Sequence, residues 1–322
     1  MNATTLRKLA TAVALSAGLT VSSGAFALDD LKLIAPAKPG GGWDQTARAM
    51  QEVMQSAGIA KAVTVENVAG AGGTVGLAQL VDKEKGNPNA LMVNGLVMVG
   101  AILTNQSAVT LEQTTPIARL TGEYEVIVVP KSSDIQNLGQ LVDKLKADPA
   151  SVAWGGGSAG GTDHILAGLI AQAVGADATK VNYVPFSGGG EALAAVMGGH
   201  VTAGVSGLSE WIGQIQAGEL RALAISSAEK IERVDIPTLK EQGVNVDLAN
   251  WRAVVAPPGI DDAQKKALAD AVDAMVKSDA WKKVLADKGW MDLYMPSDDF
   301  AKYLADENTR VTAILKTLGL VS

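Results

Sequence analysis

The sequence contains no cysteine, only two histidines and few aromatic residues, at 4% of the chain. The absence of thiols excludes disulfide scaffolds, thiolate zinc sites, iron–sulfur clusters and cysteine nucleophiles. Basic residues are also in the minority, with 27 Lys and Arg against 34 Asp and Glu. A net charge of −7 argues against a protein that binds nucleic acid through a basic stripe. We therefore expect neither a metal site nor a nucleic-acid partner.

Long apolar runs are scarce as well. The apolar segment at residues 9–21 is shorter than the ~20 residues that a membrane-spanning helix requires. It follows the basic residues Arg7 and Lys8 and precedes the small-x-small segment at residues 25–27, which is the pattern of a secretory signal peptide. We expect residues 1–27 to be a cleaved signal and the remaining chain to be exported.

Apolar runs typical of strands alternate with helical patterns along most of the chain. This alternation predicts an α/β fold with a largely parallel sheet. Two longer β-type runs, at residues 125–129 and 251–256, flank a middle αβ segment. Two crossings of the chain between two units are typical of a two-domain clamp that binds its ligand in the cleft between the domains. We expect residues 28–125 and 252–322 to form a discontinuous first lobe, and residues 126–251 to form the second.

Glycine, in contrast, is abundant, and it gathers at four strand-to-helix junctions. Glycine lets a ligand approach the backbone closely, and the helix that follows offers unpaired N–H donors that favour anions. Tight αβ turns would also explain one such loop, but four loops, two in each expected lobe, favour binding. Lys38 precedes the first loop and is well placed to meet an anion. The four loops span residues 40–44, 70–74, 155–162 and 187–191.

The third glycine loop also permits two enzymatic interpretations. Its GxGxxG spacing at residues 155–160 fits a dinucleotide fingerprint, but the next expected strand ends without an acidic residue for a ribose. Its GxSxG spacing around Ser158 fits a nucleophile elbow, with His200 as the available base. However, Gly161 and Thr162 delay the helix expected after Ser158 beyond the usual geometry of a nucleophile elbow. We expect no cofactor and no enzyme activity, and a secreted serine hydrolase that uses Ser158 is the alternative from another class.

Several segments in combination resemble the periplasmic substrate-binding receptors of the tripartite tricarboxylate transporter system, often named Bug-type receptors. The resemblance covers essentially the whole chain after residue 27. It implies a two-lobed periplasmic-binding-protein (Venus-flytrap) fold with two hinge crossings. It also implies a small-molecule carboxylate ligand, no catalysis and delivery to a two-component membrane permease. The segments that carry it span residues 39–44, 70–73, 158–164, 184–188, 198–201, 221–224, 236–238 and 251–258.

The resemblance further implies the ligand and its contacts. The Gly-Gly-Gly-aromatic-Asp form of the first loop is similar to the citrate-binding branch, which favours a tricarboxylate such as citrate. A C4-dicarboxylate or another carboxylate is the alternative within the same class. We expect a periplasmic monomer, and a receptor that reports to a membrane sensor would look the same in sequence. The expected ligand contacts, together with Lys38, are Gly41, Gly42, Trp43, Gly72, Gly73, Thr74, Ser158, Thr162, His164, Tyr183, Ser187 and Ser206.

Overall fold

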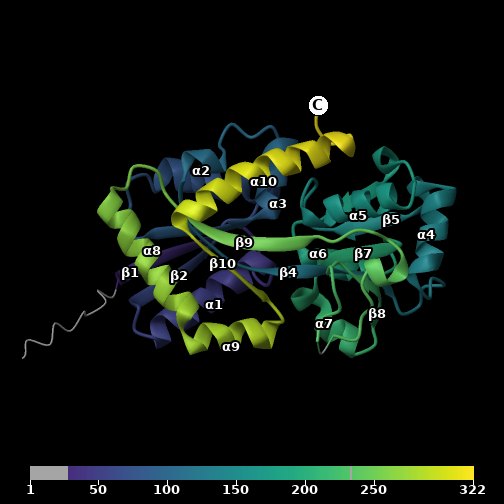
Figure 1. The fold of residues 1–322 in the computed structure, drawn as a ribbon, viewed down its shortest axis with the longest axis horizontal. Helices are drawn as coiled ribbons and strands as arrows, with labels where there is room; N and C mark the ends of the chain where they lie inside the picture. The colour runs from purple at the N-terminus through teal and green to yellow at the C-terminus, as the bar shows by residue number, and fades with distance from the viewer. Residues whose placement is uncertain (1–27, 233) are drawn as a thin grey trace, which may run out of the picture.

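The computed structural model describes residues 28–232 and 234–322 as a mixed α/β fold. The expected signal peptide lies outside the described residues. Within the described part of the chain, no helix has both the length and the apolar character needed to cross a membrane. The strands form one sheet that runs through two halves of the molecule (Figure 1).

The first half is built from both ends of the chain. Its strands are β1 (Leu28–Ala35), β2 (Ala60–Asn67), β3 (Ala90–Gly95), β9 (Ala249–Ala256), β10 (Met291–Pro296) and the first part of β4 (Thr115–Pro130). Its helices are α1 (Gly42–Ser56), α2 (Thr74–Lys83), α3 (Leu96–Thr104), α8 (Asp262–Lys277), α9 (Asp279–Lys288) and α10 (Ser297–Thr317). β1 pairs in parallel with β2 and β3, whereas β9 pairs antiparallel with β3 and β4.

The second half is built from the middle of the chain. Its strands are β5 (Ala153–Gly156), β6 (Asn182–Pro185), β7 (Ala203–Gly207), β8 (Leu220–Ile225) and the last part of β4. Its helices are α4 (Leu138–Ala147), α5 (Thr162–Ala173), α6 (Gly189–Met197) and α7 (Leu208–Gln216). Short 3₁₀ turns in the two halves are η1 (Ala71–Gly73), η2 (Leu111–Gln113), η3 (Pro149–Ser151), η4 (Ala178–Lys180) and η5 (Lys240–Gln242).

Strand β4 joins the two halves because it belongs to both. Its residues 115–124 pair with β9, and its residues 125–128 pair with β7. The chain returns to the first half through the segment that leads into β9, and Figure 1 shows β9 and β4 running side by side between the halves. The fold is therefore a two-lobed α/β architecture, in which two extended strands connect the lobes.

The sheet differs from the sequence-based expectation in two respects. Parallel pairing between the described strands is confined to β1, β2 and β3 in one half and to β5, β6 and β7 in the other, apart from an isolated bridge between Ile225 and Thr238. Every strand pair that involves β4 or β9 is antiparallel. The expectation of a largely parallel sheet is therefore wrong at the centre. Strand β10 was not expected, because its partly exposed residues lack a continuous apolar run. It pairs with β4 across an irregular register.

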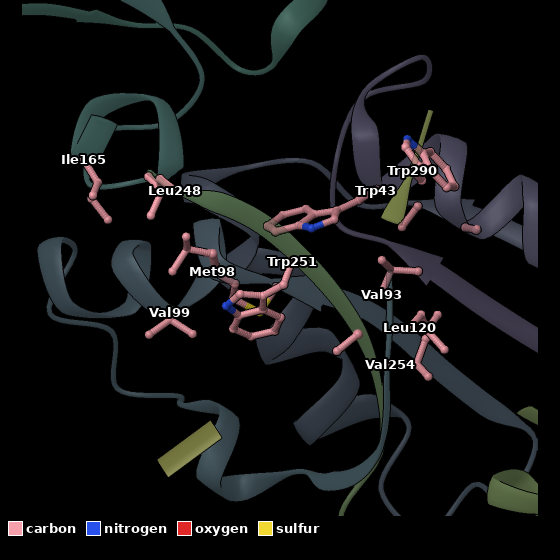
Figure 2. Close-up of a cluster of buried hydrophobic side chains, with 14 of the residues drawn as sticks. Trp43, Val93, Met98, Val99, Leu120, Ile165, Leu248, Trp251, Val254 and Trp290 are labelled. Carbon is pink, nitrogen blue, oxygen red and sulfur yellow. The ribbon is translucent and has the colours of Figure 1, made fainter. Parts of the chain in front are cut away.

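A cluster of buried side chains fixes the first glycine loop to this sheet. Figure 2 shows the indole of Trp43 directed toward β9, with Trp251, Val93 and Met98 in the same cluster. Trp43 is 7% exposed and Trp251 is 2% exposed. The Trp251 Nε1–H donates a hydrogen bond to Glu307 Oε2 on α10 at 2.7 Å, which satisfies its polar atom. The loop that carries Trp43 is thus anchored by a large apolar contact.

Candidate functional site

A cavity of about 380 Å³ lies where the two halves meet. Residues 41–43 and 70–73 line it from the first half, and residues 157–159 and 185–189 line it from the second. These segments follow the carboxyl ends of β1, β2, β5 and β6, which is where open α/β sheets bind ligands. All four glycine loops predicted from the sequence therefore converge on one cavity. Helices α1 and α6 both begin at it.

The structure divides the expected contact residues into two groups. Eight line the cavity and five do not. The residues that line the cavity are Gly41, Gly42, Trp43, Gly72, Gly73, Ser158, Ser187 and Ser206. The residues placed outside its lining are Lys38, Thr74, Thr162, His164 and Tyr183.

Asp44 holds the first glycine loop. Its carboxylate, 2% exposed, accepts hydrogen bonds from the Gly40 amide, the Asn67 side chain and the Arg48 guanidinium. Burial alone would raise the pKa of Asp44, but the hydrogen bonds from Arg48, Gly40 and Asn67 outweigh it and lower the pKa. An ionised Asp44 at the start of α1 also complements the helix dipole. The carboxylate therefore shapes the loop.

The second glycine loop requires glycine for steric reasons. Gly73 has φ +92°, and a Cβ there would lie 2.7 Å from the Trp43 ring. Gly72 has φ +63°, and a Cβ there would overlap the Cβ of Ala101. Thr74 is buried and its Oγ1 donates to the Ala71 carbonyl, which closes the η1 turn. Thr74 therefore stabilises the second glycine loop without lining the cavity.

Three side chains hold the third glycine loop from its buried side. Asp163 Oδ2 accepts from the Gly157 amide at 2.5 Å, and the Tyr183 hydroxyl donates to the Gly157 carbonyl at 2.8 Å. His164 Nδ1 accepts from the Gly160 amide at 3.1 Å, and its ring stacks on Tyr183 with centroids 4.1 Å apart. Burial lowers the pKa of His164 to about 4, so the ring is neutral at neutral pH and can accept this bond.

Thr162 and Ser158 have different surroundings on this loop. Thr162 is fully buried, and its hydroxyl has no hydrogen-bond partner among the described residues. Ser158 lines the cavity, but no hydrogen bond joins it to His164 or His200 in the part of the chain that the structure describes. The geometry therefore gives no support to a serine nucleophile with a histidine base.

Lys38 connects the two halves across the rim of the cavity. Its ammonium forms an ion pair with Glu191 on α6, and both side chains are about half exposed. Glu191 Oε2 also accepts from the Ser187 amide at 3.1 Å. The hydrogen bond from Lys38, followed by those from Ser187, lowers the pKa of Glu191. Lys38 thus lies near the expected anion site but binds a carboxylate of the protein itself.

The cavity is also lined by a buried cation, Arg252, which was not among the contact residues expected from the sequence. Its guanidinium forms an ion pair with Glu123, and both side chains are 1% exposed. Glu123 Oε2 also accepts from the Ser209 amide at 3.0 Å, and Arg252 lies over the Trp290 ring at 5.1 Å. Arg252 Nη1 has no hydrogen-bond partner within the described residues. A free donor on a buried cation can bind a carboxylate.

Further carboxyl groups surround this ion pair. Burial, followed by the charges of Asp163 and Glu123, raises the pKa of Glu125 well above its usual range. Burial also raises the pKa of Asp163 to about 6, although the Gly157 amide opposes this effect. Burial, followed by the charge of Glu123, raises the pKa of Glu210 to about 8. Asp163 and Glu210 line the cavity.

Among the described residues, no three His, Asp or Glu side chains are arranged to hold a metal ion.

Comparison with known proteins shows the family. The profile of the Tripartite tricarboxylate transporter family receptor matches residues 46–320. Protein BugT of Bordetella pertussis is 27% identical over 304 residues, which cover 93% of this chain and 92% of BugT. A UPF0065 protein from the TAR-I ttuE-ttuC' intergenic region of Agrobacterium vitis is 26% identical over 248 residues, which cover 76% of this chain and 70% of that protein.

Solved structures show the same fold. Periplasmic binding protein BugD aligns with a TM-score of 0.81 at 19% identity, over 91% of this chain and 98% of BugD. MatC from Rhodopseudomonas palustris, solved with malate, aligns with a TM-score of 0.77 at 22% identity, over 90% of this chain and 100% of MatC. Rpa4515 of R. palustris, solved with adipate, aligns with a TM-score of 0.82 at 22% identity, over 90% of this chain and 97% of Rpa4515. With the profile match over most of its length, the chain belongs to the tripartite tricarboxylate transporter receptor family, a family of Bug-type periplasmic solute-binding proteins.

Proposed function

We propose that this protein captures a small carboxylate in the cavity and delivers it to a two-component permease of a tripartite tricarboxylate transporter. The observation that carries the proposal is the convergence of four glycine loops and two helix starts on one cavity. Helix N-termini bind anions through unpaired backbone donors. The free Nη1 of Arg252 adds a buried cationic donor. The bound malate of MatC and the bound adipate of Rpa4515 support a carboxylate as the ligand class.

Within this class we propose a tricarboxylate such as citrate, with a C4-dicarboxylate as the alternative. Support comes from the number of donor groups at the cavity. The start of α1, the start of α6 and the guanidinium of Arg252 lie on three different elements. Three donor groups suit three carboxylates, whereas malate and adipate offer two.

We also propose how the receptor works as a whole. Residues 28–125 and 252–322 form one lobe, residues 126–251 form the other, and the ligand is enclosed when the lobes close. Support comes from β4 and β9, which connect the halves, and from the Lys38–Glu191 ion pair, which crosses the rim. The exported protein acts as a monomer after removal of residues 1–27.

A thermal-unfolding panel tests the function. The purified protein is heated alone and with citrate, aconitate, isocitrate, malate, succinate and aromatic carboxylates. A ligand present at 100 times its dissociation constant stabilises the folded state by about 2.7 kcal/mol, so we expect a clear rise in melting temperature with citrate. Uncharged glycerol at the same concentration is the control. Unchanged melting with every di- and tricarboxylate would refute the receptor function, and a rise with malate but not citrate would refute the tricarboxylate.

A further inference from the structure

The carboxyl group of Glu210, which lines the cavity, lies between the N-terminus of α1 and the N-terminus of α6. A Cβ built on Gly42, the first residue of α1, would lie 3.1 Å from Glu210 Oε1. A Cβ built on Gly189, the first residue of α6, would overlap Glu210 Oε2. The side chain of Glu210 therefore extends from the start of a helix in one half to the start of a helix in the other. Its Oε2 is buried and has no hydrogen-bond partner among the described residues.

The charges around Glu210 are mostly negative. Arg252 is the buried cation beside it, but Arg252 already forms an ion pair with Glu123. The rim cation Lys38 is likewise paired with Glu191. The charged groups around Glu210 include Asp163 of α5, Glu191 of α6 and Arg252 of β9, which line the cavity with it. Glu123 and Glu125 of β4 lie behind the lining, and Lys38, which precedes the first loop, lies at the rim.

An ionised Glu210 would oppose an anionic ligand in this place. Glu210 lines the cavity, so its carboxylate would lie close to the ligand's carboxylate beside buried groups, where repulsion between like charges is stronger than in bulk water. A neutral carboxyl group has the opposite effect, because its O–H can donate a hydrogen bond to a carboxylate. Burial and the charges of Glu123 and Asp163, opposed by the charge of Arg252 and a hydrogen bond from the Gly42 amide, raise the pKa of Glu210 to about 8, which makes the neutral form available at neutral pH.

We propose that Glu210 binds the ligand in its protonated form, donating a hydrogen bond from its carboxyl group to a ligand carboxylate, so that ligand capture is coupled to proton uptake. This proposal rests on the proposed carboxylate receptor function. In the free protein above about pH 8, Glu210 is ionised, and a proton from solvent moves to it as the anion binds. Glu210 thereby selects an anionic group in a cavity that is rich in carboxyl groups.

Calorimetric titration of the full chain with citrate and with malate, from about pH 7 to about pH 9, tests the coupling. Because the pKa of Glu210 is about 8, we expect the wild-type affinity to fall about tenfold over this interval. In E210Q the amide cannot lose its proton, so the affinity should change less than about twofold and exceed the wild-type affinity at about pH 9. E219Q is the matched control, because Glu219 is an exposed carboxylate near the end of the same helix and should keep the wild-type profile.

A second readout measures the proton directly. At about pH 8, titrations in phosphate and in Tris, which have different ionisation enthalpies, should show uptake of about half a proton per ligand by the wild type and none by E210Q. If E210Q does not fold, E210M takes its place and should likewise take up no proton, and an absence of uptake by the wild type overturns the proposal in either case.

Three results are distinguishable. If neither acid binds the wild type at about pH 7, the proposed function fails for these ligands. If they bind but E210Q keeps the wild-type pH profile, another group such as Glu125 carries the proton and the proposal is wrong. If E210Q loses more than about tenfold in affinity while the wild type takes up no proton, Glu210 acts as an ionised acceptor, for example of the ligand hydroxyl group, which also overturns the proposal.

Discussion

Replacing Arg252 with methionine is expected to lower the free energy of unfolding by about 3–5 kcal/mol, because it leaves Glu123 as an unpaired charge in the interior. Both side chains are 1% exposed, so water cannot replace the lost partner. The substitution also removes the contact with the Trp290 ring and the positive charge that lines the cavity. Urea unfolding measures the loss of stability, and titration with citrate measures the accompanying loss of affinity.

Two control variants separate the burial of this pair from the loss of a positive charge. The double variant E123Q/R252M contains no uncompensated buried carboxylate and should recover part of the stability. Lys266 forms an ion pair with Asp270 in which the side chains are 74% and 64% exposed, so K266M should cost less than about 1 kcal/mol. An equally small cost for R252M would contradict the role of Arg252 as the buried counter-charge.

Replacing Gly41 with valine is expected to weaken carboxylate binding by more than about a hundredfold while the protein remains folded, a loss of about 2.7 kcal/mol or more in binding free energy. Gly41 lines the cavity, and its φ of −72° and ψ of 164° suit valine. A Cβ there meets only the Lys38 carbonyl oxygen at 3.4 Å and the Ala37 Cβ at 3.7 Å. The backbone can therefore stay in place while the side chain fills space at the edge of the cavity. Calorimetric titration gives the affinity, and urea unfolding gives the stability.

The matched control for this variant is Gly213→Val on α7, because nothing lies within 4 Å of a Cβ at Gly213 and this glycine does not line the cavity. G213V should bind normally. Gly72 looks equivalent to Gly41 in the sequence, but its positive φ and the overlap with Ala101 mean that G72V would disturb the fold itself. Near-normal affinity of a folded G41V would contradict binding by the glycine loops.

The fold could be predicted where local pattern decides the structure. The apolar runs at residues 251–256 and 31–35 form the C-terminal parts of β9 and β1. Asp261 and Gln264 have the spacing of a capping box, and both of its hydrogen bonds are present at the start of α8. The direction of the central strands could not be predicted, because β4 pairs with strands more than a hundred residues away. Strand β10 was missed because its pairing to β4 depends on tertiary structure.

The candidate site shows the same division between local and distant contacts. The glycine loops are local features, and all four reach the cavity. The roles of Tyr183 and His164 behind the third loop depend on backbone hydrogen bonds that residue type alone does not indicate. Arg252 and Glu123 pair across 129 positions, so no spacing rule finds them. A usable signal was nevertheless present, since charged residues inside apolar strand runs must be paired when they are buried.

The crystal structure of the protein with the carboxylate that gives the largest thermal shift tests the central claim most directly. We expect the ligand in the 380 Å³ cavity, with one carboxylate at the start of α1, another at the start of α6 and Glu210 within hydrogen-bond distance of the ligand. Ligand bound elsewhere, for example in the apolar cavity of about 220 Å³ between α3 and α10, would contradict it. A ligand in the expected cavity that contacts none of the four glycine loops would contradict it as well.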